Sequence, residues 1–148
     1  FAHPHCPCTC ATIGELERIV ARCADRMHAV VVFIEPDSVG PDWHDSDLRN
    51  HASSIPNVSV VADQDGYEAR RFGALTSGQV LLYDQAGTLL FSGGITASRG
   101  HAGDNSGSSA IVSLLTSVQL PPGPQKCAVF GCLLFNSNLS ESNPLPKE

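Results

Sequence analysis

The apolar run Ala29-Val30-Val31-Val32-Phe33-Ile34 restricts the fold more than any other stretch of this 148-residue chain. The run is uninterrupted and rich in β-branched residues, and Glu35-Pro36 ends it. A strand without polar alternation is typically covered on both faces, as in a parallel sheet. The run is also far shorter than a membrane-spanning helix. It therefore predicts a buried strand of an α/β domain.

Helices and further strands alternate with this run. Apolar residues recur at helical spacing between Ile13 and Met27, and two strand-like runs flank an Asp-Gln-Ala-Gly turn that predicts a hairpin. The predicted strands are thus 29–34, 58–62, 79–83 and 88–92. The predicted helices after the first are 42–53, 67–72 and 108–118. This order indicates a mixed α/β sheet flanked by helices.

Composition excludes several classes of protein. The chain is 42% hydrophobic and 16% charged, which is typical of a folded protein rather than a disordered one. Its net charge of -6 provides no basic surface for nucleic acid. No apolar segment is as long as a membrane span, so we expect no membrane contact within this chain. A signal or anchor segment would lie upstream of Phe1.

The end of the last predicted helix divides the chain into a domain and a tail. Pro121-Pro122-Gly123-Pro124 ends that helix, and the sequence that follows is polar apart from residues 127–135. We therefore expect an α/β domain over residues 1–118. Residues 119–148 form a Pro-rich, cysteine-containing tail.

Three of the six cysteines, Cys6, Cys8 and Cys10, lie at or just before the start of the first helix. A capping-box sequence at residues 12–15 marks that start, with Thr9 as an alternative N-cap. The unpaired N–H groups and the dipole of a helix start lower the pKa of a cysteine and make it a reactive thiolate. The location favours disulfide exchange, in which one thiolate attacks and a second cysteine resolves the mixed disulfide.

The residues around the cysteines leave more than one chemistry open. His5 would lower the thiol pKa as an imidazolium or carry the proton, and Pro7 stiffens the turn. A Cys6–Cys8 disulfide would close a small, strained and therefore oxidising ring. Cys6 and Cys10 are about one helical turn apart, which allows a bridge or a shared soft metal such as copper(I). Incidental thiols are the third alternative.

The ordered set of motifs resembles the thioredoxin-like superfamily, especially its periplasmic and membrane-anchored thiol–disulfide oxidoreductases. The first residues, Phe1-Ala2-His3-Pro4-His5-Cys6-Pro7-Cys8, stand where that family has a strand, a Trp-Cys-x-x-Cys motif and a helix. The matching segments further along are residues 60–66, 69–73, 76–84 and 87–91. The resemblance covers roughly residues 1–118.

The resemblance implies a thioredoxin-like mixed sheet whose central strand lies upstream of Phe1, so we predict a natural protein that is longer at its N-terminus. It also implies that Cys6 attacks and Cys8 resolves, with Cys10 as the alternative resolving cysteine. Gly78 matches the cis-proline that faces the family's active site, and a glycine there lets a partner backbone approach closely.

The loop after the hairpin and the tail carry the remaining candidates. In the resembled fold that loop borders the active-site groove, where Arg99 would stabilise a thiolate and His101 would act as a base or ligand. A solvated loop that caps the last helix is compatible with this. Cys127 and Cys132 are candidates for a structural disulfide or a second redox pair. Cys23 lies on the apolar stripe of the first helix, so we expect it to be buried.

The sequence therefore predicts a thiol–disulfide oxidoreductase that exchanges disulfides with protein thiols and disulfides and needs no cofactor. We expect it in an extracytoplasmic space, either periplasmic or anchored to a membrane facing the periplasm. The alternative is a copper-binding assembly factor of the same superfamily, in which Cys6, Cys10 and His101 hold the metal.

Overall fold

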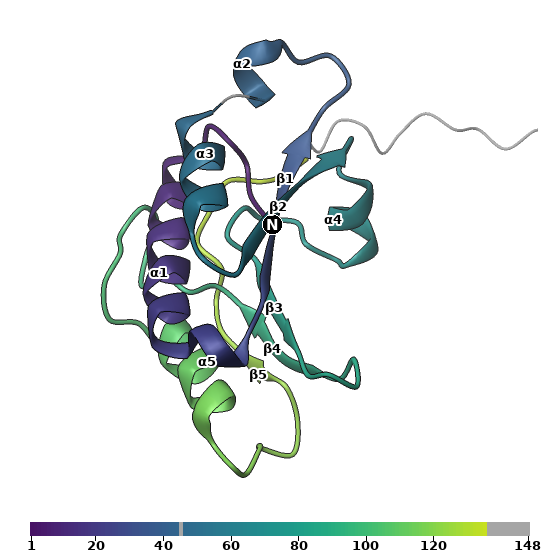
Figure 1. The fold of residues 1–148 in the computed structure, drawn as a ribbon. Helices are drawn as coiled ribbons and strands as arrows, with labels where there is room; N and C mark the ends of the chain where they lie inside the picture. The colour runs from purple at the N-terminus through teal and green to yellow at the C-terminus, as the bar shows by residue number, and fades with distance from the viewer. Residues whose placement is uncertain (45, 136–148) are drawn as a thin grey trace, which may run out of the picture.

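The computed structural model describes residues 1–44 and 46–135 and has a mixed α/β architecture with two small sheets (Figure 1). As far as α5, helices and strands follow in the order that the sequence predicts, with the predicted helix at 42–53 divided into two. The elements are α1 (Pro7–Cys23), the 3-10 turn η1 (Ala24–Arg26), β1 (Ala29–Glu35), α2 (Pro41–His44), α3 (Asp47–Ser54), β2 (Val58–Gln64), α4 (Tyr67–Arg71), β3 (Val80–Tyr83), β4 (Leu89–Gly93), α5 (Ser106–Thr116) and β5 (Gln125–Lys126).

The apolar run forms strand β1, which pairs with β2 in parallel from Ala29 opposite Val58 to Glu35 opposite Gln64. The prediction of a parallel strand is confirmed. The prediction that it is covered on both faces is wrong at Val30, which is 53% exposed, whereas Val31 and Phe33 are buried. The first residues of β1 border the space between the two sheets.

The predicted hairpin forms the second sheet, in which β3 and β4 are antiparallel. Strand β5, which the sequence did not indicate, adds to this sheet in parallel beside β4. Helix α5 begins at Ser106, and the Asn105 side chain caps it by accepting a hydrogen bond from the backbone N–H of Ser108. This confirms that the polar loop before the helix supplies its cap.

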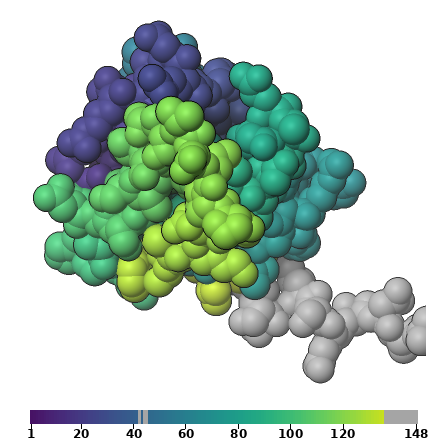
Figure 2. Space-filling model, turned by 90° about the horizontal axis from the view of Figure 1, so that it is seen from below, coloured from purple at the N-terminus to yellow at the C-terminus, as the bar shows by residue number. Residues whose placement is uncertain are grey.

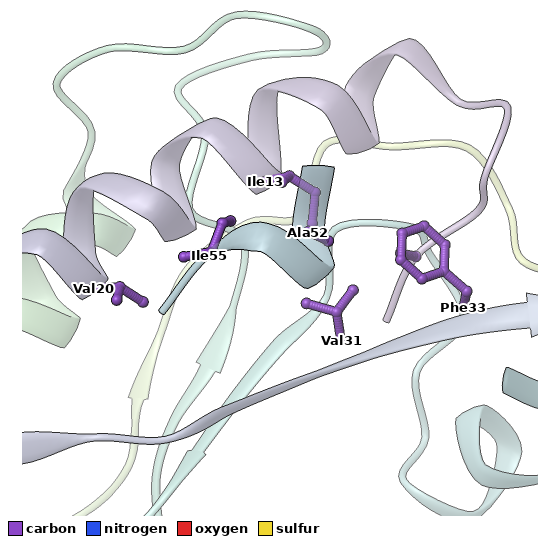
Figure 3. Close-up of a cluster of buried hydrophobic side chains, with 7 residues drawn as sticks. Ile13, Val20, Val31, Phe33, Ala52 and Ile55 are labelled. Carbon is purple, nitrogen blue, oxygen red and sulfur yellow. The ribbon is translucent and has the colours of Figure 1, made fainter. Parts of the chain in front are cut away.

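The main core lies between helices α1 and α3 and strand β1 (Figure 3). The apolar stripe of α1 forms because its residues recur at helical spacing, and that stripe faces the sheet. Cys23 is buried, as the sequence predicts. The residues of this cluster are Ala2, Ile13, Val20, Val31, Phe33, Ala52 and Ile55. A second cluster joins α1 to β4 and α5 through Ile19, Phe91, Ile95, Ile111 and Leu114.

The first two residues lie between the two sheets. Ala2 continues a parallel ladder beside β1, because its N–H donates to the Val32 carbonyl (2.8 Å) and its carbonyl accepts from Ile34 (3.0 Å). On the other side, Gly78 donates to the Phe1 carbonyl (2.8 Å). Beyond them, a cavity of about 540 Å³ separates β1 from β3.

The tail packs against the domain as far as the structure describes it. After β5 the chain returns along the molecule towards the ends of β1 and β2 (Figure 1), and its surface lies beside α5 (Figure 2). The Ala128 carbonyl accepts from Gly94 (3.2 Å), and the Cys132 carbonyl accepts from Ser77 (2.8 Å). Residues 136–148 of the predicted tail lie outside the described part of the chain.

A candidate redox site at the start of helix α1

Helix α1 begins at Pro7, earlier than the sequence predicts, and Cys6 is its N-cap residue. The predicted capping box is wrong, because the Thr12 hydroxyl donates to the Cys8 carbonyl (3.1 Å) inside the helix instead. A proline at the first helical position needs no hydrogen bond for its nitrogen and has the φ angle of a helix, which explains the earlier start. The correction moves Cys6 to the helix start itself.

A buried polar network fixes the loop that leads to Cys6. The Thr9 hydroxyl donates to the His3 carbonyl (3.0 Å) and lies 2.5 Å from the Ser77 hydroxyl, which accepts from the His3 N–H (3.0 Å). The Thr9 and Ser77 side chains are fully buried. Because buried polar groups are costly unless paired, this network holds the cysteine loop against the turn that contains Ser77. The sequence did not indicate it.

The sulfur atom nearest to Cys6 belongs to Cys132. The two Sγ atoms are 3.0 Å apart, and both residues are free thiols. A disulfide bond is about 2.0 Å long, so the two sulfur atoms lie within about 1 Å of bonding distance. The tail brings Cys132 here because its carbonyl accepts the hydrogen bond from Ser77 described above. The structure therefore brings together a thiol at the start of α1 and a thiol of the tail.

The environment of Cys6 favours its thiolate. Burial raises the pKa of Cys6, but hydrogen bonds from the Cys132 side chain and from the backbone N–H groups of Cys132, Thr9 and Cys8 outweigh burial and lower that pKa from 9.0 to about 7. The pKa of Cys132 is raised, first because its thiol donates to Cys6 and then because of burial. Cys6 therefore ionises first, and the proton stays on Cys132.

Arg99 lies beside this pair, in agreement with the expected position of its loop. Its guanidinium donates to the Gly131 carbonyl (3.0 Å) and approaches the Cys132 Sγ (3.8 Å). Hydrogen bonds to Cys8 and Cys132 raise the pKa of Arg99, so the buried Cys8 thiol also faces this side chain. The Arg99 guanidinium thus interacts with Cys8 and Cys132, two of the three cysteines at this site.

The two histidines before Cys6, His3 and His5, belong to an aromatic cluster with Trp43. The rings of His3 and His5 pack edge-on against Trp43, with centroid distances of 4.9 and 4.8 Å. Burial, and then the neighbouring His5, lower the pKa of His3, which disfavours an imidazolium there. The main groups that lower the pKa of Cys6 are Cys132 and backbone N–H groups. An aromatic cluster thus covers one side of the loop.

Glycines allow the tail to approach the site. Gly78 has a φ of +92°, which favours glycine, and a Cβ there would lie 3.0 Å from the Thr12 hydroxyl. The described residues contain no cis peptide bond. The closest backbone approach is at Gly131, where a Cβ would lie 1.8 Å from the Ser77 carbonyl oxygen. The glycine that lets the tail approach the Ser77 backbone is therefore Gly131, and the predicted role of Gly78 towards a partner backbone stays a prediction.

Cys10 and His101 form no metal site with this pair. Cys10 is exposed on α1 and lines the same pocket as Cys6, and the His101 ring lies against the Arg99 carbonyl (2.7 Å). Among the described residues, no group of three or more His, Cys, Asp or Glu side chains is arranged to hold a metal. The copper set of Cys6, Cys10 and His101 is thus not assembled in this structure.

The predicted bridge between Cys127 and Cys132 is also absent, and both are free thiols. Cys127 lies 3.7 Å from the Ser106 hydroxyl, while Cys132 faces Cys6. The two sulfur atoms therefore lie in different parts of the molecule.

Comparison of the chain with protein-family models, curated proteins and solved structures gave no match. Within residues 1–44 and 46–135, no helix is both long and apolar enough to cross a membrane. The case for a function therefore rests on the chemistry of the site.

Proposed function

We propose that the protein is a thiol–disulfide oxidoreductase that exchanges disulfides with protein partners, with Cys6 as the attacking cysteine and Cys132 as the resolving cysteine. The observation that carries this proposal is the 3.0 Å contact between the two Sγ atoms, of which one belongs to a thiol with a pKa of about 7. A thiolate that forms near neutral pH and a thiol within bonding reach are the two requirements of disulfide exchange.

The exchange proceeds in two displacements. The Cys6 thiolate attacks one sulfur of a partner disulfide, the partner's S–S bond breaks, and the second partner sulfur leaves as a thiolate and takes a proton. Cys132 then loses its proton and attacks the Cys6 sulfur, which releases the first partner sulfur as a thiol. The partner gains two electrons and two protons, and the chain ends with a Cys6–Cys132 disulfide. The reverse sequence oxidises a partner.

Cys132 replaces Cys8 as our first choice for the resolving cysteine. Cys8 belongs to the first turn of α1, and a Cys6–Cys8 bridge would close a small ring that spans the helix start. Cys132 comes from a separate segment and already contacts Cys6. Cys8 meets Cys6 through its backbone N–H, and its side chain faces Arg99, so it remains the second choice.

The architecture is compatible with a thioredoxin-like fold, which we also propose. A cysteine loop before a helix, a parallel strand pair, an antiparallel hairpin and a last helix follow in the order that this resemblance implies. An extracytoplasmic location, periplasmic or membrane-anchored, remains part of the proposal because disulfides persist in oxidising compartments.

Titration with a glutathione redox buffer tests the function. The reduced chain is equilibrated at several ratios of reduced to oxidised glutathione, quenched with acid and mapped by mass spectrometry. We expect a Cys6–Cys132 disulfide to be the first to form, and Cys6→Ser to abolish exchange with a peptide disulfide. Cys10→Ser is the matched control, because Cys10 is an exposed thiol of the same helix. Exchange that persists in Cys6→Ser refutes the proposal.

A further inference from the structure

Two backbone hydrogen bonds pair the end of the tail with the turn before β3. The Ser77 N–H donates to the Cys132 carbonyl (2.8 Å). The Leu134 N–H donates to the Leu75 carbonyl (2.9 Å). Bonds of this kind involve no side chain, so a tail shifted along its own length could form them as well. They hold the tail without deciding which of its residues faces Cys6.

Two adjacent leucines of the tail have opposite environments. Leu134 is 6% exposed and packs in a cluster with Ile34, Ala69 and Ala74, whereas Leu133 is 64% exposed. Successive side chains of a strand-like segment point to opposite faces, which explains the difference. The domain thus offers the tail an apolar pocket on one face, and Leu134 occupies it.

This pocket sets the register of the tail and, with it, the face on which Cys132 lies. Around the bridge between Leu133 and Thr76 the tail is strand-like, so Cys132 and Leu134, two residues apart, share its inward face. On that face the Cys132 Sγ lies 3.0 Å from the Cys6 Sγ. A shift of the tail by one residue would turn Cys132 outward and separate the two sulfur atoms.

We propose that Leu134 is the positioning residue of the resolving cysteine: burial of its side chain sets the register in which Cys132 meets Cys6. This inference rests on the proposed function and concerns its second displacement. In that step the Cys132 thiolate attacks the Cys6 sulfur of the mixed disulfide, and an S–S bond forms between the two cysteines. The partner sulfur leaves with the electron pair of the broken bond and takes a proton. Leu134 acts through the tail and is not a reacting group.

The effective concentration of Cys132 at Cys6 measures this positioning. In a glutathione buffer, Cys132 displaces glutathione from its mixed disulfide with Cys6, which gives the Cys6–Cys132 disulfide and one free glutathione thiol. The ratio of the second disulfide to the first, multiplied by the concentration of reduced glutathione, is the effective concentration. The Cys6 sulfur is in a disulfide in both forms, so the ratio does not depend on the ionisation of Cys6.

Leu134→Ala tests the proposal. Glutathione on Cys6 takes the position that Cys132 has against that sulfur atom, so the tail leaves its pocket in the mixed disulfide and returns in the Cys6–Cys132 form. The burial that Leu134→Ala loses therefore counts in only one of the two forms. We expect the effective concentration to fall by about tenfold. Mass spectrometry after an acid quench measures both disulfides at one fixed pH.

Leu114→Ala is the matched control for lost stability. Leu114 is 7% exposed and belongs to the core cluster of α1, β4 and α5, so it is buried in both disulfide forms. Its loss cancels in the ratio, and we expect the effective concentration to stay within about twofold. Leu133→Ala should also change it little. Leu134→Met, which nearly conserves the side-chain volume, should retain most of it. Circular dichroism verifies that each variant is folded.

The outcomes separate this inference from the proposed function. An unchanged effective concentration in Leu134→Ala, or an equal fall in Leu114→Ala, refutes the positioning role even if exchange occurs. Absence of the Cys6–Cys132 disulfide from the unaltered chain at every glutathione ratio refutes both. Exchange that persists in Cys6→Ser refutes the function alone. If Leu134→Ala does not fold, Leu134→Val removes less volume, and a fall of about threefold is then expected.

Discussion

Two segments supply the sulfur atoms of the candidate site, and the structure holds them in different ways. Cys6 caps a 17-residue helix, and the buried pair of Thr9 and Ser77 fixes the loop before it. Cys132 belongs to an extended segment that follows a two-residue strand and bonds to its neighbours at a few backbone positions. One side of the site is therefore set by the domain core, and the other by a strand-like surface contact.

This difference is consistent with the proposed roles. A helix start presents unpaired N–H groups that stabilise a thiolate, which suits the attacking cysteine that we propose. A segment held by few contacts moves at low free-energy cost, which suits the proposed resolving cysteine. The predictions below test this division, and they are arranged from the largest expected effect to the smallest.

Loss of the fixed cysteine should have the largest effect. Cys6→Ser removes the attacking sulfur, so we expect the rate of exchange with a peptide disulfide to fall by more than about a hundredfold. The measurement is release of a chromophoric thiol at pH 7. A rate in Cys6→Ser within a few-fold of the unaltered protein would show that another cysteine attacks.

Loss of the tail cysteine should change the pH profile of Cys6. Cys132→Ala removes the thiol that donates to the Cys6 thiolate, so the pKa of Cys6 should rise from about 7 towards 9.0. Each unit of increase lowers the thiolate fraction below the pKa by about tenfold. Alkylation rates from pH 5 to 10 report the midpoint. An unchanged midpoint would assign the low pKa to the helix start alone.

The two tail leucines should differ in their effect on stability. Leu134→Ala leaves a cavity among buried residues, so we expect the free energy of unfolding to fall by about 2 kcal/mol, at the low end for buried leucines because the segment is peripheral. Leu133→Ala, its exposed neighbour, should change it by less than about 0.5 kcal/mol. Urea denaturation measures both. Equal values would contradict the packing of Leu134 described above.

Neutralising the cation beside the tail should have the smallest effect. Arg99→Gln removes a positive charge near Cys8 and Cys132 but keeps a donor for the Gly131 carbonyl. Because Arg99 is exposed and screened by water, we expect the exchange rate to change by less than about threefold. A larger loss in low salt that disappears in high salt would indicate a stronger electrostatic role.

Much of the fold was predictable because helices and strands depend on near neighbours. The β-branched run of β1 and the apolar stripe of α1 are local patterns, and both elements form where they were expected. The start of α1 was misplaced because two threonines resemble N-caps, although Pro7 begins the helix. Strand β5 was missed because two polar residues carry no strand pattern, and only β4 beside them makes a strand there.

The site was predictable on one side only. The cysteines before an amphipathic helix singled out Cys6 as a candidate reactive thiol, and Arg99 was expected near the cysteine loop. Thr9 and Ser77 were missed because their network joins segments that are 68 positions apart. The glycine before Cys132 and the three consecutive apolar residues after it, Leu133-Leu134-Phe135, were the signals that a packed contact was possible, but neither identifies the segment that the tail meets.

The sequence by itself determined the order of the elements and the thiol at a helix start, because periodicity and helix polarity act over a few residues. Tertiary structure alone decided which sulfur faces Cys6. Closeness in the sequence favoured Cys8 and Cys10 as partners of Cys6. It also predicted a disulfide between Cys127 and Cys132. Burial of Leu134 and pairing with Leu75–Ser77 instead bring Cys132 across 126 positions to Cys6, since a packed tail places its side chains by contacts rather than by spacing.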